Sequence, residues 1–259
     1  MAEPERITSR DNQRLTDLRK VREGKDASRI FIEGVRLASE AVRSGLAINA
    51  CFVAESFKDR NAFRDLDART TVVADQLFPA IADTKHPQGI ILLAKRPLHA
   101  LENLFHPNAI VVFLNKINNP SNLGAITRTA EASGASGIIT SPGSVDAFSP
   151  KSLRASMGSA FRLPIVQNIP LIDAHRWAKE NGMSCVAADI SGETSYTAVD
   201  WNEPKLLVLG SEAHGLSDKD LNLIDERIVI PMHASVESLN LAVSAAVILF
   251  EAARQRSSD

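Results

Sequence analysis

Asn122 and Arg128 stand in a segment whose residue types and spacing could do chemistry. Residues 118–130 read N-N-P-S-N-L-G-A-I-T-R-T-A, and they leave an apolar stretch and enter a predicted helix. Asn122 can cap that helix, Gly124 permits close backbone approach, and a helix N-terminus suits an anion. An ordinary capped helix with one exposed arginine would look similar. An arginine among alanine and isoleucine is nevertheless unusual for a purely solvent-facing surface, so Arg128 is a candidate for chemistry.

A second segment, residues 207–216, reads L-V-L-G-S-E-A-H-G-L. An apolar predicted strand ends there in a loop that Gly210 and Gly215 bound, and the loop carries one carboxylate, Glu212. Glycines leave backbone amides accessible to a ligand. A tight turn from a strand to a helix also uses glycines, so this segment alone does not decide between the two.

A third segment, residues 228–240, reads I-V-I-P-M-H-A-S-V-E-S-L-N and precedes a nearly continuous apolar stretch, residues 241–253. Ser238 and Asn240 stand at the start of the predicted helix, and Ser238 is a possible N-cap. A helix with apolar residues on every side is buried rather than surface-lying. We therefore expect this helix to pack on a sheet and against a second copy of the chain.

Other common site patterns are missing from the sequence. No G-x-G-x-x-G follows a predicted strand and no G-x-x-x-x-G-K-[ST] is present, which argues against an ordinary dinucleotide fold, phosphate loop or common methyltransferase. No serine elbow is present. The 6 histidines show no metal-ligand spacing, so we expect no metal.

Two α/β units must position these segments. In the first, we predict helices over residues 11–23 and 34–45 and strands over 29–33, 48–54, 71–74 and 89–94. Residues 96–107 are polar and break this pattern with prolines, which indicates a linker. The predicted domains are therefore residues 1–95 and 108–259, joined by 96–107.

The second unit alternates short apolar strands with helices. We predict strands over residues 109–114, 137–140, 165–166, 184–189, 206–210 and 228–231, and helices over 122–133, 171–181 and 239–256. This alternation predicts a mostly parallel sheet covered on both faces. Ligands of such sheets bind beyond the carboxyl ends of the strands, which is where all three segments lie.

The composition is that of an ordinary globular protein with no strong overall charge. The chain has 259 residues, 44% of them hydrophobic, and a formal net charge of -2. Bulk charge thus argues weakly against nucleic acid, and RNA contact would need a local patch. Residues 10–29 carry 7 Lys or Arg and 4 Asp or Glu, a local net of +3, which is also typical of a solvated helix.

Cysteine usage and apolar runs bear on location. The 2 cysteines lie far apart, which predicts free thiols in a reducing cytosol. The first residues are polar and charged, unlike a signal peptide, and no apolar run reaches the ~18–20 residues that cross a bilayer. We expect a cytoplasmic protein without membrane contact.

The order and wording of the three segments resemble the motifs of the SpoU/TrmH family of RNA 2′-O-ribose methyltransferases, in the SPOUT superfamily. N-x-x-N-L-G-A-I-x-R-T-A, L-G-S-E-x-x-G-L and I-P-M-x-x-x-x-E-S-L-N-L-A-V stand here in that order, within residues 109–256. Residues 7–12, 31–36 and 87–90 are similar to the ribosomal-protein-like substrate-binding domain of many ribosomal-RNA members. One departure is Asn119, where many members have Asp.

The resemblance implies a C-terminal domain with a deep trefoil knot, which periodicity does not predict, and an obligate homodimer. It also implies that S-adenosylmethionine is held largely by backbone atoms. The implied cofactor-binding residues are Thr140, Leu209, Gly210, Ser211, Gly215, Ile230, Met232, Ser238 and Leu239. The residues that match the family's functional polar positions are Asn122, Arg128, Glu212, Ser238 and Asn240.

The implied reaction is methyl transfer to a ribose 2′-hydroxyl, with large-subunit ribosomal RNA as the substrate. We expect Arg128 to hold a neighbouring phosphate and stabilise the developing alkoxide. The candidate RNA-reading residues are Arg10, Arg14, Arg19, Arg22 and Arg29. The alternatives are a transfer-RNA ribose methyltransferase, a base methyltransferase of the wider superfamily, and a non-catalytic RNA-binding or ribosome-assembly protein with the same fold.

Overall fold

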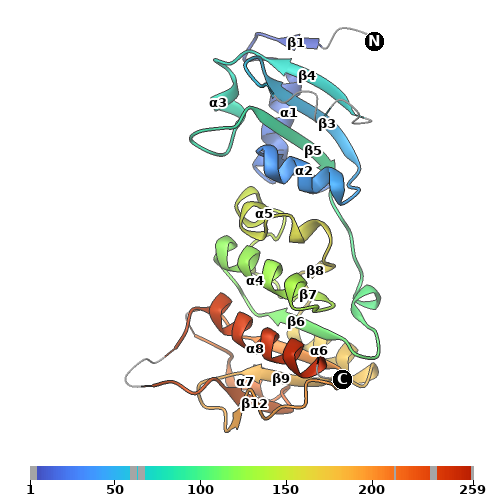
Figure 1. The fold of residues 1–259 in the computed structure, drawn as a ribbon, viewed down its shortest axis with the longest axis vertical. Coiled ribbons are helices and arrows are strands. Elements are labelled where there is room, and N and C mark those ends of the chain that lie inside the picture. Colours follow the sequence, from blue (N-terminus) through green and yellow to red (C-terminus); the bar gives the residue numbers. More distant parts are fainter. Residues whose placement is uncertain (1–4, 59–62, 64–67, 213, 234–237, 258–259) are drawn as a thin grey trace. The chain divides into compact units, whose positions relative to one another are not determined.

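The computed structural model describes residues 5–58, 63, 68–212, 214–233 and 238–257. The chain forms two compact units, whose elements are labelled in Figure 1. Unit 1 comprises Met1–Pro97 and Phe148–Phe161, and unit 2 comprises Leu98–Ala147 and Arg162–Asp259. Each unit contains one sheet covered by helices, and the prediction of an α/β chain with a parallel sheet in its C-terminal part is confirmed.

Unit 1 is built on a mixed five-stranded sheet of order β1-β4-β3-β5-β2. Its elements are β1 (Glu5–Ile7), α1 (Gln13–Arg22), β2 (Arg29–Glu33), α2 (Val35–Arg43), β3 (Ile48–Ala54), β4 (Arg69–Val73), α3 (Phe78–Ile81), β5 (Ile90–Lys95), α5 (Pro150–Ser156) and the 3-10 helix η3 (Ser159–Phe161). Strands β1, β4 and β3 are parallel, and β5 is antiparallel to both of its neighbours. The carboxyl ends of β1, β2, β3 and β4 therefore lie at one edge of this sheet.

Helix α1 shows why the local sequence folds as it does. The side chain of Asn12 accepts a hydrogen bond from the N–H of Arg14 and caps the helix. Leu15, Leu18 and Val21 follow at helical spacing and are buried, which gives the helix one apolar face. The polar residues between them stay at the surface.

Unit 2 is built on a seven-stranded sheet of order β10-β12-β9-β11-β6-β7-β8, and every pairing in its described strands is parallel. Its elements are the 3-10 helix η2 (Leu101–Leu104), β6 (Ile110–Leu114), α4 (Pro120–Ala132), β7 (Gly137–Thr140), β8 (Ile165–Gln167), α6 (Leu171–Glu180), β9 (Ser184–Ala188), β10 (Thr194–Ser195), β11 (Lys205–Leu209), α7 (Asp218–Leu221), β12 (Glu226–Val229) and α8 (Leu241–Arg256). Strand β11 comes late in the chain yet lies between β6 and β9.

Because of the register of these strands, four loops begin next to one another at the same edge of the sheet. Leu209 at the end of β11 pairs with Leu114 of β6 and with Ala188 of β9, and Ala188 in turn pairs with Ile228 of β12. The chain leaves each strand just beyond this row. The segments that follow β6, β9, β11 and β12 consequently begin side by side at one edge of the sheet.

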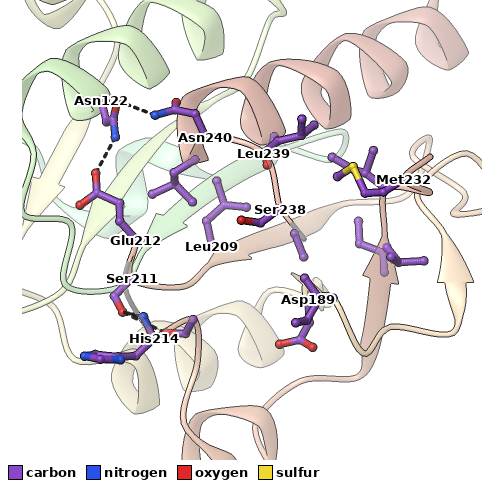
Figure 2. A pocket seen from close by; sticks show the side chains of 18 of the residues that line it. Asn122, Asp189, Leu209, Ser211, Glu212, His214, Met232, Ser238, Leu239 and Asn240 are labelled. Carbon is purple, nitrogen blue, oxygen red and sulfur yellow. Dashed lines mark hydrogen bonds between the residues drawn. The ribbon is translucent and has the colours of Figure 1, made fainter. Parts of the chain in front are cut away.

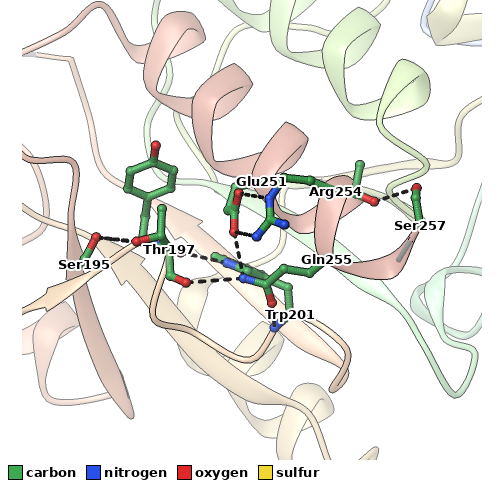
Figure 3. A network of polar contacts seen from close by, with 9 residues as sticks. Ser195, Thr197, Trp201, Glu251, Arg254, Gln255 and Ser257 are labelled. Carbon is green, nitrogen blue, oxygen red and sulfur yellow. Dashed lines mark hydrogen bonds and ion pairs between the residues drawn. The ribbon is translucent and has the colours of Figure 1, made fainter. Parts of the chain in front are cut away.

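The last turn of α8 is fixed by a polar network, shown in Figure 3. The backbone N–H of the fully buried Trp201 donates to Oε1 of Gln255 at 3.0 Å, and the indole N–H of Trp201 donates to the carbonyl of Tyr196 at 2.9 Å. Arg256 donates through Nε to the carbonyl of Trp201 at 2.7 Å. Glu251 accepts from Arg254 and Gln255, and these bonds hold the pKa of Glu251 at about 2.

Two predicted helix starts are wrong, with consequences for the site. Asn119, not Asn122, caps α4: its Oδ1 accepts from the N–H of Ser121 at 2.9 Å, and Pro120 takes the first helical position. Asn240, not Ser238, caps α8, because its Oδ1 accepts from the N–H of Ala242 at 2.9 Å. The side chains of Asn122 and Ser238 are thereby released from capping.

The predicted domain boundaries remain predictions, but the structure adds two facts about them. Leu104 lies inside the predicted linker, residues 96–107, yet it is fully buried in the core of unit 2 beside Val111 and Trp177. Residues 148–161 belong to unit 1 although they fall inside the predicted C-terminal domain. There Arg154 forms an ion pair with Asp83 at 2.7 Å. The sequence did not predict α5, which is short and begins at Pro150.

Both cysteines, Cys51 and Cys185, are buried free thiols. Burial raises the pKa of Cys51 to about 11 and that of Cys185 to about 12. Because the thiolate is the reactive form, neither side chain is suited to nucleophilic chemistry at neutral pH. Within the described ranges, the helices fall short of the length and apolarity that a membrane span requires.

We predict that Leu104→Ala destabilises unit 2 by about 2–5 kcal/mol, because it removes fully buried methyl groups and leaves a cavity. Chemical denaturation measures the change. Leu98→Ala is the matched control, since Leu98 lies in the same stretch of chain but is 82% exposed. Equal loss of stability in both variants would contradict the assignment of Leu104 to the core.

Candidate active site

An open cavity of about 1070 Å³ lies at the carboxyl edge of the unit 2 sheet, and Figure 2 shows most of its lining side chains. All four loops that begin at the common row contribute to it, together with the start of α8. Its lining residues are Asn118, Asn119, Asn122, Ala188, Asp189, Ile190, Leu209, Ser211, Glu212, His214, Gly215, Ile228, Val229, Ile230, Met232, Ser238, Leu239, Asn240, Leu241 and Ser244.

The side-chain amide of Asn122 joins the three motif segments of the sequence. Its Nδ2 donates to Oε1 of Glu212 at 2.6 Å, and its Oδ1 accepts from Nδ2 of Asn240 at 3.4 Å (Figure 2). An ionised carboxylate only accepts hydrogen bonds, so the amide nitrogen of Asn122 must face Glu212. The cap bond of Asn240 uses its oxygen and leaves its nitrogen for Asn122. Each amide orientation is thus set by a partner.

The loop after β11 closes tightly on itself. Ser211 and Gly215 exchange two backbone hydrogen bonds, each 3.0 Å long. A Cβ at Gly210 would lie 2.4 Å from the carbonyl carbon of Gly215, and Gly215 has a φ of +62°. Only glycine suits either position. The geometry of the loop therefore requires the two glycines, which by themselves were only a weak signal in the sequence. The closed loop presents Glu212 to Asn122.

The cavity combines an apolar and a polar wall. Leu209, Ile230, Met232 and Leu239 provide apolar surface. The amides and carboxylate around Asn122 provide polar groups at the other side, together with the exposed Ser238. Such a lining suits a ligand with one apolar part and a few groups that need directed hydrogen bonds.

The structure brings together most of the predicted cofactor-binding residues but not all. Leu209, Ser211, Gly215, Ile230, Met232, Ser238 and Leu239 line the cavity. Gly210 lies behind the closed loop and is buried. Thr140 is 1% exposed at the end of β7, where its carbonyl accepts from the N–H of Ile169, and it is not part of the lining.

Arg128 is the predicted catalytic residue that the cavity does not include. It is exposed on α4, six residues after Asn122 along the helix, and it is not among the lining residues. Asn122, Glu212, Ser238 and Asn240 do line the cavity. The structure thus places Arg128 on the same helix as Asn122 but outside the lining of this cavity.

Sequence reasoning missed Asp189 and Ile190, which follow β9. The carboxylate of Asp189 accepts from the N–H of Ser191 at 2.8 Å and from its hydroxyl, which orders this turn. Ile190 is 78% exposed although it is apolar. The signal in the sequence was the position just after a buried strand. This position alone did not identify a site residue, because the local sequence does not reveal that β9 lies next to β11 in the sheet.

The predicted RNA-reading arginines of unit 1 do not form one open basic face. Arg14 pairs with Glu5 at 2.9 Å, and Arg22 donates to the carbonyl of Ala82 at 2.8 Å. Arg29 makes two hydrogen bonds of 2.8 Å to Asp17, which raise its pKa. Arg19 donates to the backbone of Arg10 at 3.3 Å, and Arg10 itself is exposed.

Comparison with known proteins decides the family. Residues 109–250 match the model of the SpoU rRNA Methylase family, and residues 12–92 match that of the MRM3-like substrate binding domain. The first match covers more than half of the chain and all of the motif segments. The chain belongs to the SpoU rRNA methylase family. The resemblance read from the sequence is thereby confirmed.

Two SpoU relatives have defined activities. One is 23S rRNA (guanosine(2553)-2′-O)-methyltransferase RlmP of Bacillus subtilis, 28% identical, with 94% of this chain and 97% of the relative covered. The other is 23S rRNA (uridine(2479)-2′-O)-methyltransferase of Streptomyces viridochromogenes, 31% identical, with 89% and 84% covered.

Solved SpoU structures of similar fold hold the cofactor AdoMet. AviRb from Streptomyces viridochromogenes in complex with AdoMet has a TM-score of 0.86 at 28% identity, with 96% of this chain and 100% of that chain covered. An AdoMet-bound rRNA methyltransferase from Sinorhizobium meliloti has a TM-score of 0.87 at 28% identity, with 96% and 97% covered. The lining of the cavity in this chain fits such a ligand, because the glycine-bounded loop, the apolar wall and the polar groups around Asn122 can take a nucleoside that carries a sulfonium side chain.

We predict that Asn122→Asp lowers the affinity for S-adenosylmethionine by about 10–100-fold, because it replaces the amide donor by a carboxylate that faces Glu212 at 2.6 Å. The loss of a hydrogen bond to a charged group costs about 1.5–3 kcal/mol. Isothermal titration calorimetry measures the affinity. Asn118→Asp is the control: it adds the same charge to the same lining without facing Glu212. An equal loss of affinity in both variants would show that the added negative charge, and not the lost hydrogen bond to Glu212, causes the effect.

Proposed function

We propose that this protein transfers a methyl group from S-adenosylmethionine to a ribose 2′-hydroxyl of large-subunit ribosomal RNA. The observation that carries the proposal is the Asn122 amide, which joins all three SpoU motif segments at one cavity. Membership of the SpoU family and the activities of relatives that match nearly the whole chain support the same reaction. A cytoplasmic location suits the two buried free thiols.

The backbone of residues 209–215, 230–232 and 238–241 would hold the cofactor. When bound, S-adenosylmethionine supplies an electrophilic methyl group, so the protein must orient and polarise rather than provide a reactive group. The closed loop after β11 leaves room for a ligand against its backbone. We include in the proposal that the segments around the cavity form the trefoil knot of the family. Thr140 would support the pocket from behind and not contact the cofactor.

The chain's own polar residues would prepare the 2′-hydroxyl for attack. Holding the hydroxyl in line with the methyl group supplies much of the rate by proximity. Ser238 would position the ribose, and the hydrogen bonds among Asn122, Glu212 and Asn240 would keep the loops in place. Proton loss needs an acceptor, for which a phosphate oxygen of the RNA or a water suffices.

Arg128 would act on the RNA. Its exposed guanidinium can hold the phosphate beside the target ribose through two parallel hydrogen bonds and stabilise the developing alkoxide. A guanidinium has a pKa above ~12 and does not serve as the base. This role is consistent with its place on α4 outside the lining of the cavity.

A homodimer is part of the proposal. Helix α8 buries Ala245, Ile248, Leu249 and Ala252 within its own chain, yet Val243 and Phe250 on the same helix are 47% and 53% exposed. They are seven residues apart and so lie along one stripe of the helix. A second copy that covers this stripe would remove both apolar side chains from water. Helix α4, which carries Arg128, packs beside α8.

We predict that Arg128→Ala lowers methyl transfer by at least about 100-fold, since it removes the stabilisation of developing charge, and leaves S-adenosylmethionine affinity unchanged. Labelled cofactor is offered with ribosomal RNA and transfer RNA separately. Label in ribosomal RNA that resists alkaline cleavage identifies 2′-O transfer. Wild-type turnover by Arg128→Ala would exclude the catalytic assignment of Arg128. Label in transfer RNA alone would identify transfer RNA as the substrate instead of ribosomal RNA. Cofactor binding without any methyl transfer would favour a non-catalytic binding protein.

We predict that Phe250→Glu converts the dimer to a monomer, because it places a charge on the stripe that the second copy covers. Analytical ultracentrifugation measures the mass. Ile172→Glu is the matched control: Ile172 is 49% exposed but lies on α6. A dimer that persists in Phe250→Glu, or a wild-type protein that is monomeric, would contradict this interface.

A further inference from the structure

We propose that a cavity at the carboxyl edge of the unit 1 sheet binds one unstacked base of the substrate RNA. The inference rests on the proposed function, because it assigns the reading of RNA to a site on unit 1. The cavity has a volume of about 460 Å³. Side chains from four loops line it, among them Val35, Phe57, Lys58, Asp75, Phe78 and Gln88.

Three of the candidate arginines, on α1 and at the start of β2, are already engaged within unit 1. Arg14, Arg22 and Arg29 already hold Glu5, the end of α3 and Asp17, respectively. Engaging a phosphate would require each to give up these bonds. Recognition of RNA by unit 1 would therefore rest largely on groups other than these three arginines.

The topology of the sheet supplies such a surface. The carboxyl ends of β2, β3 and β4 lie at one edge, next to the start of β5, and the cavity is bordered by the residues just beyond them. Two glycines keep the walls close together. Gly34 has a φ of +98° and a Cβ there would lie 2.9 Å from Oε1 of Gln88; Gly89 has a φ of +82° and its Cβ would lie 3.3 Å from that of Ala54.

The floor of the cavity is apolar and aromatic. Phe57 and Phe78 are 9% and 2% exposed, and Pro79 and Pro87 add apolar surface at the sides. Proteins that recognise RNA sequences bind splayed bases against aromatic side chains and read the edges of those bases by hydrogen bonds. A cavity of this size admits a single nucleotide and not a duplex.

Directed polar groups lie at the rim. Oε1 of Gln88 accepts from the N–H of Val35 at 2.9 Å, and the Nε2 donor of Gln88 makes no hydrogen bond to the other described residues. On the opposite side, Oδ1 of Asp75 accepts from the N–H of Ser56 at 3.0 Å and from its hydroxyl at 2.9 Å. The rim thus offers the Nε2 donor of Gln88, and the bonds from Ser56 hold the Asp75 carboxylate in a fixed position at the other side.

One lysine lines the cavity, and two further cationic residues stand close in sequence to its lining residues Val35 and Pro87. Lys58 lies in the lining, and Arg36 and Lys85 are exposed in the first turn of α2 and in the loop before β5. No ion pair in the described part of the chain engages them. Asp83, the carboxylate of that loop, is paired with Arg154. The phosphates on either side of a bound base would meet these positive side chains.

The test compares Gln88→Glu and Lys58→Glu with Lys25→Glu. Gln88→Glu keeps the oxygen that accepts from Val35 and removes the amide donor. Lys25 is an exposed lysine between α1 and the start of β2, at the opposite edge of the sheet. Loss of the donor to the base in Gln88→Glu and loss of the positive charge facing the phosphates in Lys58→Glu are each expected to raise the KM for ribosomal RNA at least about 10-fold, and Lys25→Glu is expected to leave it unchanged. S-adenosylmethionine affinity stays unchanged in all three.

A second measurement locates the RNA without relying on methyl transfer. Wild-type full-length protein is irradiated with large-subunit ribosomal RNA that contains 4-thiouridine, and the cross-linked peptides are identified by mass spectrometry. Cross-links to residues 56–58 or 87–89 support the cavity. Cross-links confined to α1, or wild-type KM values for both cavity variants, overturn it. Cross-links at the cavity without methyl transfer would uphold this inference while the proposed function fails.

Discussion

The pairing of β11 with β6 on one side and β9 on the other is the constraint on which the active site depends. These strands are distant in sequence, yet Leu209 stands level with Leu114 and Ala188. Parallel strands in register deliver their loops to one edge. Three segments that have no local reason to meet therefore do so, and a single amide, that of Asn122, holds two of them to the third. The register of the strands brings the loops together, and the side chains on those loops then determine the chemical character of the cavity.

The two units solve different recognition problems with similar means. Each gathers loops at the carboxyl ends of strands, and each uses glycines where backbone or side chains come too close for a Cβ. In unit 2 the result is a large cavity with an amide network and an apolar wall. In unit 1 the result is a smaller cavity lined by two phenylalanines and one lysine. Under the proposal made above, this division separates the chemistry of the methyl donor from the choice of RNA.

Periodicity and motif order predicted most of the fold, and the limits have physical causes. Strands β2 and β3 have the predicted bounds because a short apolar run between polar or glycine-containing segments is a local property of the sequence. Strand β1 and helix α5 were missed because three to seven residues hold too little pattern. Asn119 caps α4 and Asn122 lies in its first turn, and only the place of Pro120 distinguishes the cap from the site residue. Asp189 could not be found, since its importance comes from strand order.

Helix α8 links the cavity to a remote part of unit 2. Asn240 at its first end lines the cavity, while Gln255 and Arg256 at its last turn bind the segment around Trp201. At 1.5 Å per residue these ends are about 22 Å apart, and a helix transmits displacement along its axis as a rod. Removing or fusing residues at the last turn would thus disturb a ligand site that those residues never touch. The end of this helix is a poor place for a tag or a truncation.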